Sequence, residues 1–163
     1  MRNHLLSGAV TLVLIAACGT SAASVSTSTG AGTRSPCVSA NAPHRAYVVV
    51  EHHSGATMQN CVGFSGDFID GQTLMDRSGF QYEAQGVTSA RIVCQVDFEP
   101  KQFSQCVPTN QPYWALFIES GGRWTNAPGG LNSVRLLDKE AIGWHYVGAT
   151  DRPPAPPPLA KKA

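Results

Sequence analysis

The chain has 163 residues, which is enough for one ordinary domain with additional terminal segments. Charged residues form 14% of it and the formal net charge is +1, so the composition gives no support to the many phosphate contacts of a nucleic-acid-binding protein. Its 16 glycines and 11 prolines are typical of turn-rich β proteins outside the cytoplasm, and we expect no nucleic-acid partner.

The N-terminal segment has the pattern of an export signal. An apolar run at residues 5–17 follows a basic residue and is too short to span a bilayer as a helix. The small residues Ala16 and Ala17 before Cys18 resemble the bacterial lipobox, in which the cysteine is acylated and becomes the first mature residue. We therefore predict a lipoprotein signal peptide at residues 1–17 and a lipid anchor at Cys18, on the extracytoplasmic face of the cell membrane. The alternative is an ordinary signal peptide cleaved a few residues later, which discards the cysteine.

Two segments have compositions that predict no packed core. Residues 18–35 follow the anchor as a linker of mostly Ser, Thr, Gly and Ala, which is typical of a flexible tether. Residues 149–163 are proline-rich and predict a disordered, extended tail, with binding to a proline-recognising partner as the less favoured alternative. The remaining residues, 36–148, are predicted to form one globular domain.

The first half of this domain predicts a hairpin followed by a helix. Residues 45–52 are rich in Val and Tyr, and residues 57–64 alternate, so the two are expected to pair as strands. Residues 68–80 predict one short helix, because Asp70 can cap its start and Gly79 stands where a left-handed residue would end it.

The second half predicts only strands, at residues 80–84, 90–96, 113–119 and 141–147. A short helix packed on a mostly antiparallel mixed sheet is an α+β fold.

Four cysteines remain in the domain once Cys18 is assigned to the lipid. An even number in an exported chain predicts two disulfides, for which three pairings exist. We favour Cys94 with Cys106, because the loop between them is short, and Cys37 with Cys61. A metal site is the less favoured alternative, because the sequence has no CxxC pair and no histidine at zinc-finger spacing.

The sequence shows no nucleophile elbow, phosphate loop or HExxH motif, so we predict no catalytic residue, metal or cofactor. His52 and His53 are adjacent near a strand end, where neighbouring side chains point to opposite faces. Asp97 and Glu99 share a face if their strand continues, but we expect no neighbouring histidine or pocket for them and therefore expect them to face solvent. A small hydrolase using His52 or His145 is the enzymatic alternative.

Aromatic residues gather in the last third of the chain and provide a tentative ligand-binding surface. The candidates are Tyr113, Trp114, Trp124 and Trp144. Packing in the core or at its rim is the favoured interpretation for most of them. Strand alternation places Trp144 and Tyr146 on one face and separates Tyr113 from Trp114.

Several motifs together resemble the transcobalamin-like C-terminal domain, in particular its small secreted or lipid-anchored actinobacterial members. They are "DFIDGQTLMDRSGF", "YWALFI", "GGRWTNAP" and "LLDKEAIGWHYV", within residues 45–147. The residues that match the family pattern are Tyr113, Trp114, Trp124, Gly143 and Trp144. The turn "LDKEA" departs from the pattern, since it lacks the family's glycine.

The resemblance implies a small β-grasp-like domain and, weakly, a cobalamin-type ligand. The helical barrel that supplies most of a cobalamin carrier's binding surface is absent from this sequence. We therefore expect a non-enzymatic, lipid-anchored extracytoplasmic domain that binds a ligand or an envelope protein. The alternative is a structural cell-envelope protein without a small ligand.

Overall fold

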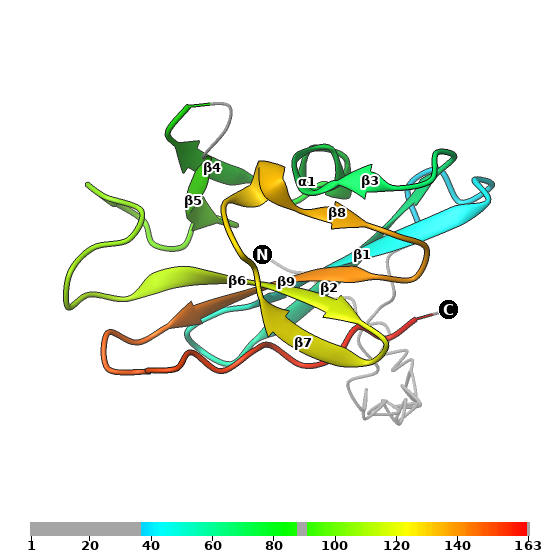
Figure 1. Cartoon of the computed structure of the whole chain (residues 1–163). Coiled ribbons are helices and arrows are strands. Elements are labelled where there is room, and N and C mark those ends of the chain that lie inside the picture. Colours follow the sequence, from blue (N-terminus) through cyan, green and yellow to red (C-terminus); the bar gives the residue numbers. More distant parts are fainter. Residues whose placement is uncertain (1–36, 88–90, 163) are drawn as a thin grey trace, which may run out of the picture. The chain divides into compact units, whose positions relative to one another are not determined.

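A five-stranded mixed sheet forms the centre of the computed structural model, which describes residues 37–87 and 91–162 (Figure 1). Its strands, in spatial order, are β2 (Thr57–Phe64), β1 (His44–Glu51), β9 (Ala141–Val147), β6 (Tyr113–Ser120) and β7 (Arg123–Asn126). The central pair β1 and β9 is parallel, and every other neighbouring pair in this sheet is antiparallel. The predicted α+β class is confirmed.

The two central strands are buried on both faces. In β1 the residues from Ala46 to Val50 are each at most 1% exposed, and β9 is similarly buried from Ala141 to Trp144. A strand whose successive side chains are all buried needs material on both sides of the sheet, because neighbouring side chains point to opposite faces. We call the side covered by the helix, described next, the helix face, and the opposite side the outer face.

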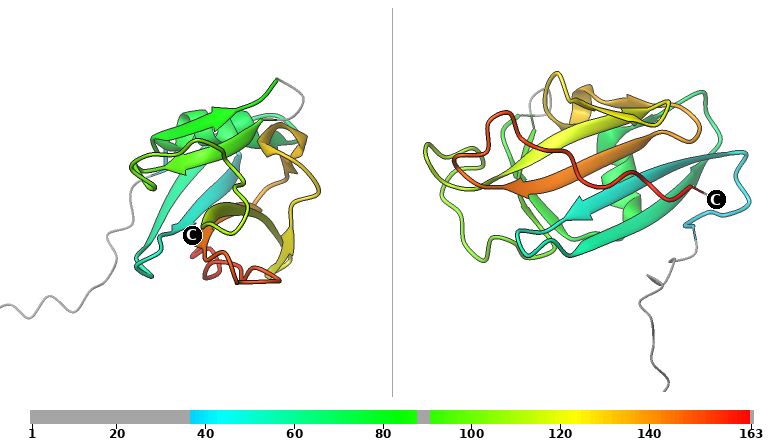
Figure 2. Two further views of the ribbon diagram at one scale, coloured as in Figure 1. Left: turned by 90° about the vertical axis from the view of Figure 1, so that its left-hand side faces the viewer. Right: turned by 90° about the horizontal axis from the view of Figure 1, so that it is seen from below.

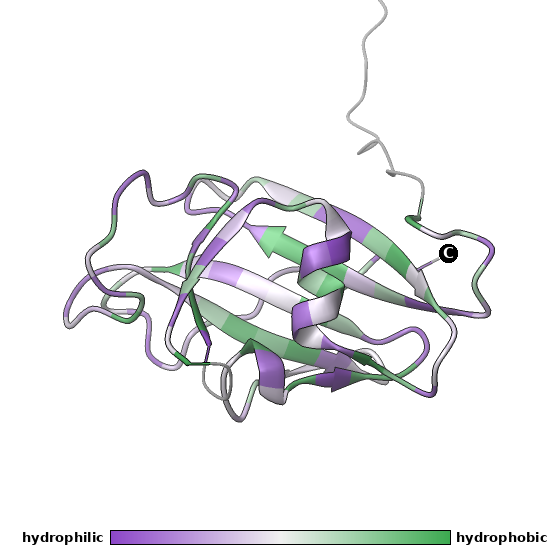
Figure 3. Cartoon of the chain, turned by 90° about the horizontal axis from the view of Figure 1, so that it is seen from above, coloured by the Kyte–Doolittle hydropathy of each residue, from purple (hydrophilic) through white to green (hydrophobic). Residues whose placement is uncertain are grey.

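Helix α1 (Gly71–Ser78) lies across the helix face, where Leu74 and Met75 are fully buried (Figure 3). Its predicted ends are confirmed. The Asp70 side chain accepts a hydrogen bond from the Thr73 amide at 2.8 Å, and Gly79 ends the helix in the left-handed conformation with φ 85°.

Two small sheets complete the cover of the helix face (Figure 1). One pairs β3 (Ile69–Asp70) with β8 (Arg135–Leu136), and the other pairs β4 (Tyr82–Gln85) with β5 (Ile92–Val96). A short 3-10 helix, η1 (Leu131–Ser133), precedes β8. Leu131 and Leu136 contribute fully buried side chains to the main core.

The Asp70 cap makes helix stability dependent on pH. Partial burial works to raise the pKa of Asp70, but hydrogen bonds from the amide and hydroxyl of Thr73 outweigh it, so this pKa lies below the ordinary 3.8. A lowered pKa stabilises the fold above the ordinary value, and the contribution disappears as pH falls through the folded-state pKa.

We expect Asp70→Ala to reduce the free energy of unfolding by about 1 kcal/mol at pH 7, because the cap is lost. Urea denaturation should show the gap to the parent closing at pH values below the folded-state pKa. Asp70→Asn is the matched control, since its amide oxygen can still accept the Thr73 hydrogen bond. Equal losses in both variants at pH 7 would contradict this role of the cap.

Both favoured disulfides are present. Cys37 is joined to Cys61 on β2, and Cys94 on β5 is joined to Cys106 in the connection to β6. The first bridge holds the chain at Val38 beside β2, where Val38 forms a parallel bridge with Val62.

The proline-rich segment differs from its prediction. Residues 149–162 are not a disordered tail but lie along the outer face of the sheet, where Pro157 is buried (Figure 2). The Gln59 side chain donates to the Lys161 carbonyl at 2.8 Å and accepts from the Lys161 amide at 2.7 Å. Composition showed that this segment has no core of its own, but the surface it packs on belongs to distant strands.

The predicted signal peptide, Cys18 and the linker at residues 18–35 lie outside the described residues. Among residues 37–87 and 91–162, no helix is both long enough and apolar enough to cross a bilayer.

Candidate functional site

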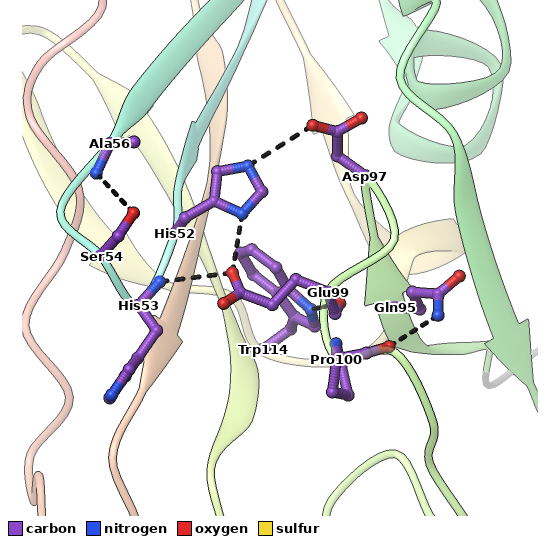
Figure 4. A network of polar contacts seen from close by, with 9 residues as sticks. All are labelled: His52, His53, Ser54, Ala56, Gln95, Asp97, Glu99, Pro100 and Trp114. Atoms are coloured by element: carbon purple, nitrogen blue, oxygen red, sulfur yellow. Dashed lines mark hydrogen bonds and ion pairs between the residues drawn. The ribbon is translucent and has the colours of Figure 1, made fainter.

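His52 lies at one end of the sheet between two carboxylates (Figure 4). It follows the last residue of β1, and its side chain is 15% exposed. Its Nδ1 lies 2.7 Å from Glu99 Oε2, and its Nε2 lies 3.7 Å from Asp97 Oδ2. With Glu99 ionised, the ring nitrogen is the donor, because a carboxylate can only accept.

Glu99 is the centre of this network. The Glu99 oxygen that contacts His52 also accepts from the His53 amide at 3.3 Å. Its backbone carbonyl accepts from the Trp114 indole at 2.7 Å. Glu99 thereby joins the β1–β2 turn to the start of β6, two parts of the chain far apart in sequence.

A tight turn at Asp97 and Phe98 precedes Glu99. Val96 and Glu99 close it with two backbone hydrogen bonds, of 3.0 and 2.9 Å. Both central residues have positive φ, 48° for Asp97 and 63° for Phe98. This left-handed conformation is uncommon for residues other than glycine, and uncommon conformations of this kind concentrate at functional sites. Phe98 is nevertheless 68% exposed, so the turn holds a large apolar side chain in solvent.

The expectation that no histidine neighbours Asp97 and Glu99 is wrong. The fold brings His52 between them from 45 or more positions away in the sequence. The His52 ring contacts Trp114 and the His53 ring contacts Tyr146, and the rings of Trp114 and Tyr146 lie 5.0 Å apart, so both histidines contact the same aromatic pair. Within residues 37–87 and 91–162, no cluster of three or more potential ligands could hold a metal ion.

The four tentative ligand-binding aromatics do not form one surface. Trp114 and Trp144 are 3% and 2% exposed in the core on the helix face. Trp124 and Tyr113 pack in clusters on the outer face instead. Tyr146 packs against the same core as Trp144, so the predicted sharing of a face is confirmed.

A small hollow lies next to the histidine network, under the connection from β5 to β6. Its volume is about 70 Å³, and its lining includes Pro100, Phe103, Tyr113 and Tyr146. Burial raises the pKa of Tyr146, and the negative charge of Glu99 raises it further. The phenol therefore remains a neutral hydrogen-bond donor at this end of the sheet well above neutral pH.

His145, the other histidine of the enzymatic alternative, lies on the outer face. Its Nδ1 donates to the Ala155 carbonyl at 2.7 Å, since a carbonyl can only accept, and its Nε2 lies 3.7 Å from Glu51. His145 is thus engaged with the proline-rich segment and is separate from the His52 network.

Comparison with known proteins adds little to this geometry. No family model matches the chain, and no curated protein matches it. Among solved structures, a protein of Ruminococcus gnavus described as a "putative metal binding protein" is similar with a TM-score of 0.45 and 13% sequence identity. The similarity covers 64% of this chain and 97% of that one. We transfer no property from it to this chain.

Proposed function

We propose that the chain is a non-enzymatic, lipid-anchored extracytoplasmic domain that binds a protein partner through the turn at Phe98. The main support for this proposal is that Phe98 is 68% exposed on a turn whose backbone has an uncommon conformation. Large aromatic side chains are enriched among the residues that dominate binding energy in protein interfaces.

The surroundings of the turn support binding with little loss of flexibility. Glu99 is held by His52, His53 and Trp114, so the residue that follows Phe98 is restrained through both its side chain and its backbone. A side chain presented on a restrained backbone loses less conformational entropy when it enters a partner's pocket. Asp97 adds a partly exposed carboxylate beside the aromatic ring.

A macromolecular partner fits the surface better than a small ligand does. Pockets for drug-sized ligands have volumes of roughly 300 to 1,000 Å³, whereas the hollow beside Tyr146 has about 70 Å³. The cobalamin-type ligand implied by the transcobalamin-like resemblance is therefore the weaker form of the proposal. The order β2-β1-β9-β6, with a helix after the first hairpin and parallel strands in the centre, supports the β-grasp-like assignment.

Photo-crosslinking in intact cells tests this proposal. A photoreactive amino acid at position 98 should crosslink to one discrete protein, whereas the same group at Leu137, which is 56% exposed elsewhere, should not. With that protein purified, Phe98→Ala should weaken binding at least about tenfold, and Leu137→Ala should leave it unchanged. Cys18→Ala should release the protein from the membrane fraction in the same cells.

The crosslinking and binding experiments test the partner surface, and the membrane fractionation tests the lipid anchor. Equal crosslinking at both positions, or binding insensitive to Phe98→Ala, would remove the partner surface and favour a structural envelope protein. Retention of the Cys18→Ala protein in the membrane fraction would remove the lipid anchor alone.

A small hydrolase is the second candidate, and the His52–Glu99 contact favours it. A carboxylate that orients an imidazole is a common part of general-base catalysis. The second ring nitrogen of His52 faces Asp97. Among the described residues, no serine, threonine or cysteine is hydrogen-bonded to His52. Ester or amide hydrolysis abolished by His52→Gln, with folding intact, would establish this candidate over the binding domain.

A further inference from the structure

Residues 151–162 run along the outer face of the sheet (Figure 2), where side chains from four strands hold them. These side chains, which we call the outer-face set, are Gln59, Glu119, Trp124 and His145, together with the bare backbone of Gly143. Each contacts the segment directly or lies against it.

The segment faces the sheet with a period of three residues. Pro154 and Ala160 are half-buried and Pro157 is buried, whereas the residues between them are exposed. A polyproline II helix has three residues per turn, so every third side chain lies on one side. The burial pattern is that of such a helix lying along the sheet.

Two members of the outer-face set bind the segment's backbone. His145 donates to the Ala155 carbonyl, and the Gln59 amide pairs with both the carbonyl and the amide of Lys161. Contacts to backbone atoms recognise an extended conformation whatever the side chain at that position. They would therefore act equally on a segment from another chain.

The position of Pro157 is shaped for a proline ring. A Cβ atom on Gly143 would lie 2.7 Å from Pro157 Cγ and 2.8 Å from the ring of Trp124. Only glycine lets the proline ring and the indole approach the strand this closely. A proline beside an aromatic ring is the usual contact in the recognition of proline-rich peptides.

A charge pair between Glu119 and Lys162 fixes the orientation of the segment on the sheet. Glu119 is fully buried, and its carboxylate pairs with the Lys162 ammonium. Because a buried carboxylate needs a partner, this position selects a cation five residues after the buried proline.

The segment leaves one donor of the outer face unused. Trp124 Nε1 is buried, and no described residue accepts its hydrogen bond. Between the described residues, no backbone-to-backbone hydrogen bond joins residues 152–162 to a strand. The segment is thus held by side chains alone, and it supplies no acceptor to the buried indole N–H of Trp124.

We propose that the outer face is a peptide-binding site for proline-rich segments with a lysine five residues after the central proline, and that residues 151–162 occupy it in cis as a displaceable ligand. The occupant in trans is a segment of this chemistry from another polypeptide. The site is separate from the turn at Phe98, which lies at the end of the sheet.

Competition with a labelled peptide tests the proposal on the full chain. The probe is a fluorescent peptide with the sequence of residues 151–162. Lys162→Met weakens the segment in cis but leaves Glu119 free for the probe, so this variant should bind the probe at least tenfold more tightly than the parent. Adding Gln59→Ala should reduce that binding about tenfold. A probe with Pro157→Gly is the matched control and should bind at least tenfold more weakly.

A second measurement covers the case in which the Lys162→Met protein does not fold. The chain has 3 tryptophans, so the indole N–H resonance of Trp124 can be assigned by substitution and followed in the parent protein. The probe has the same sequence as the segment it displaces, so it carries a nitroxide label in this measurement. An excess of the labelled probe should broaden that resonance, whereas the labelled Pro157→Gly probe should not. No broadening in the parent together with no binding to a folded Lys162→Met variant would overturn the proposal, as would binding that Gln59→Ala leaves unchanged.

Discussion

Replacing Lys162 with methionine is expected to lower the free energy of unfolding by about 3 kcal/mol, because it leaves a buried carboxylate without its cation. Glu119 is 0% exposed, and its side chain has only two described polar contacts, the Lys162 ammonium and the Gly122 amide at 2.9 Å. The amide hydrogen bond alone does not neutralise the charge. Urea denaturation at pH 7 measures the difference.

The adjacent lysine supplies the matched control. Lys161 contacts Gln59 only through its backbone, and its side chain is exposed. Lys161→Met should therefore change the free energy of unfolding by less than about 0.5 kcal/mol. Adding Glu119→Gln to Lys162→Met should recover much of the loss, because the buried group is then neutral. Equal effects of the two lysine substitutions would mean that residues 151–162 do not close over Glu119.

Removal of the bridge between Cys37 and Cys61 should cost a similar amount. For a sequence separation of 24, the chain-entropy relation predicts a loss of about 3.5 kcal/mol when both cysteines become serine. Cys61 is 6% exposed, so a serine hydroxyl there adds a desolvation cost. Equilibrium denaturation under non-reducing conditions measures the total.

Removal of the second bridge, between Cys94 and Cys106, is the control that separates a general loss of stability from a local effect at the first bridge. Cys94→Ser with Cys106→Ser removes a separation of 12 and should cost slightly less by the same relation. The Gly63 amide donates to the Val38 carbonyl at 2.7 Å beside the first bridge. Hydrogen exchange at Gly63 should therefore accelerate only when Cys37 and Cys61 are replaced. Equal acceleration in both double variants would contradict the local role of the first bridge.

Local sequence signals were sufficient for the helix and for most strands. Asp70 and Gly79 predicted both ends of α1 because capping depends on residues within a few positions of each helix end. The Val-rich run of β1 predicted a buried strand for a similar reason. Short loop length correctly favoured Cys94 with Cys106, and the other pair followed.

The candidate site could not be found this way. His52 and Glu99 belong to no motif, and they meet only because β1 and the connection after β5 end at the same place. The positive φ of Phe98 also has no sequence signal, since an Asp-Phe pair lacks the glycine that normally marks such a turn. The last third of the chain is rich in aromatic residues, as the tentative ligand-binding surface required. Strand alternation nevertheless places these residues on opposite faces of the sheet.

Periodicity and capping residues were sufficient to predict the α+β class and the capped helix, and loop length favoured the observed one of the three possible cysteine pairings. Where residues 151–162 pack depends on the tertiary structure alone. Their composition predicts a polyproline II conformation but says nothing about a surface to pack on. That surface needs Gln59, Glu119, Gly143 and His145 from strands that become neighbours only in the folded sheet. Burial and charge pairing across such distances are properties of the assembled fold, because no residue's local neighbours specify them.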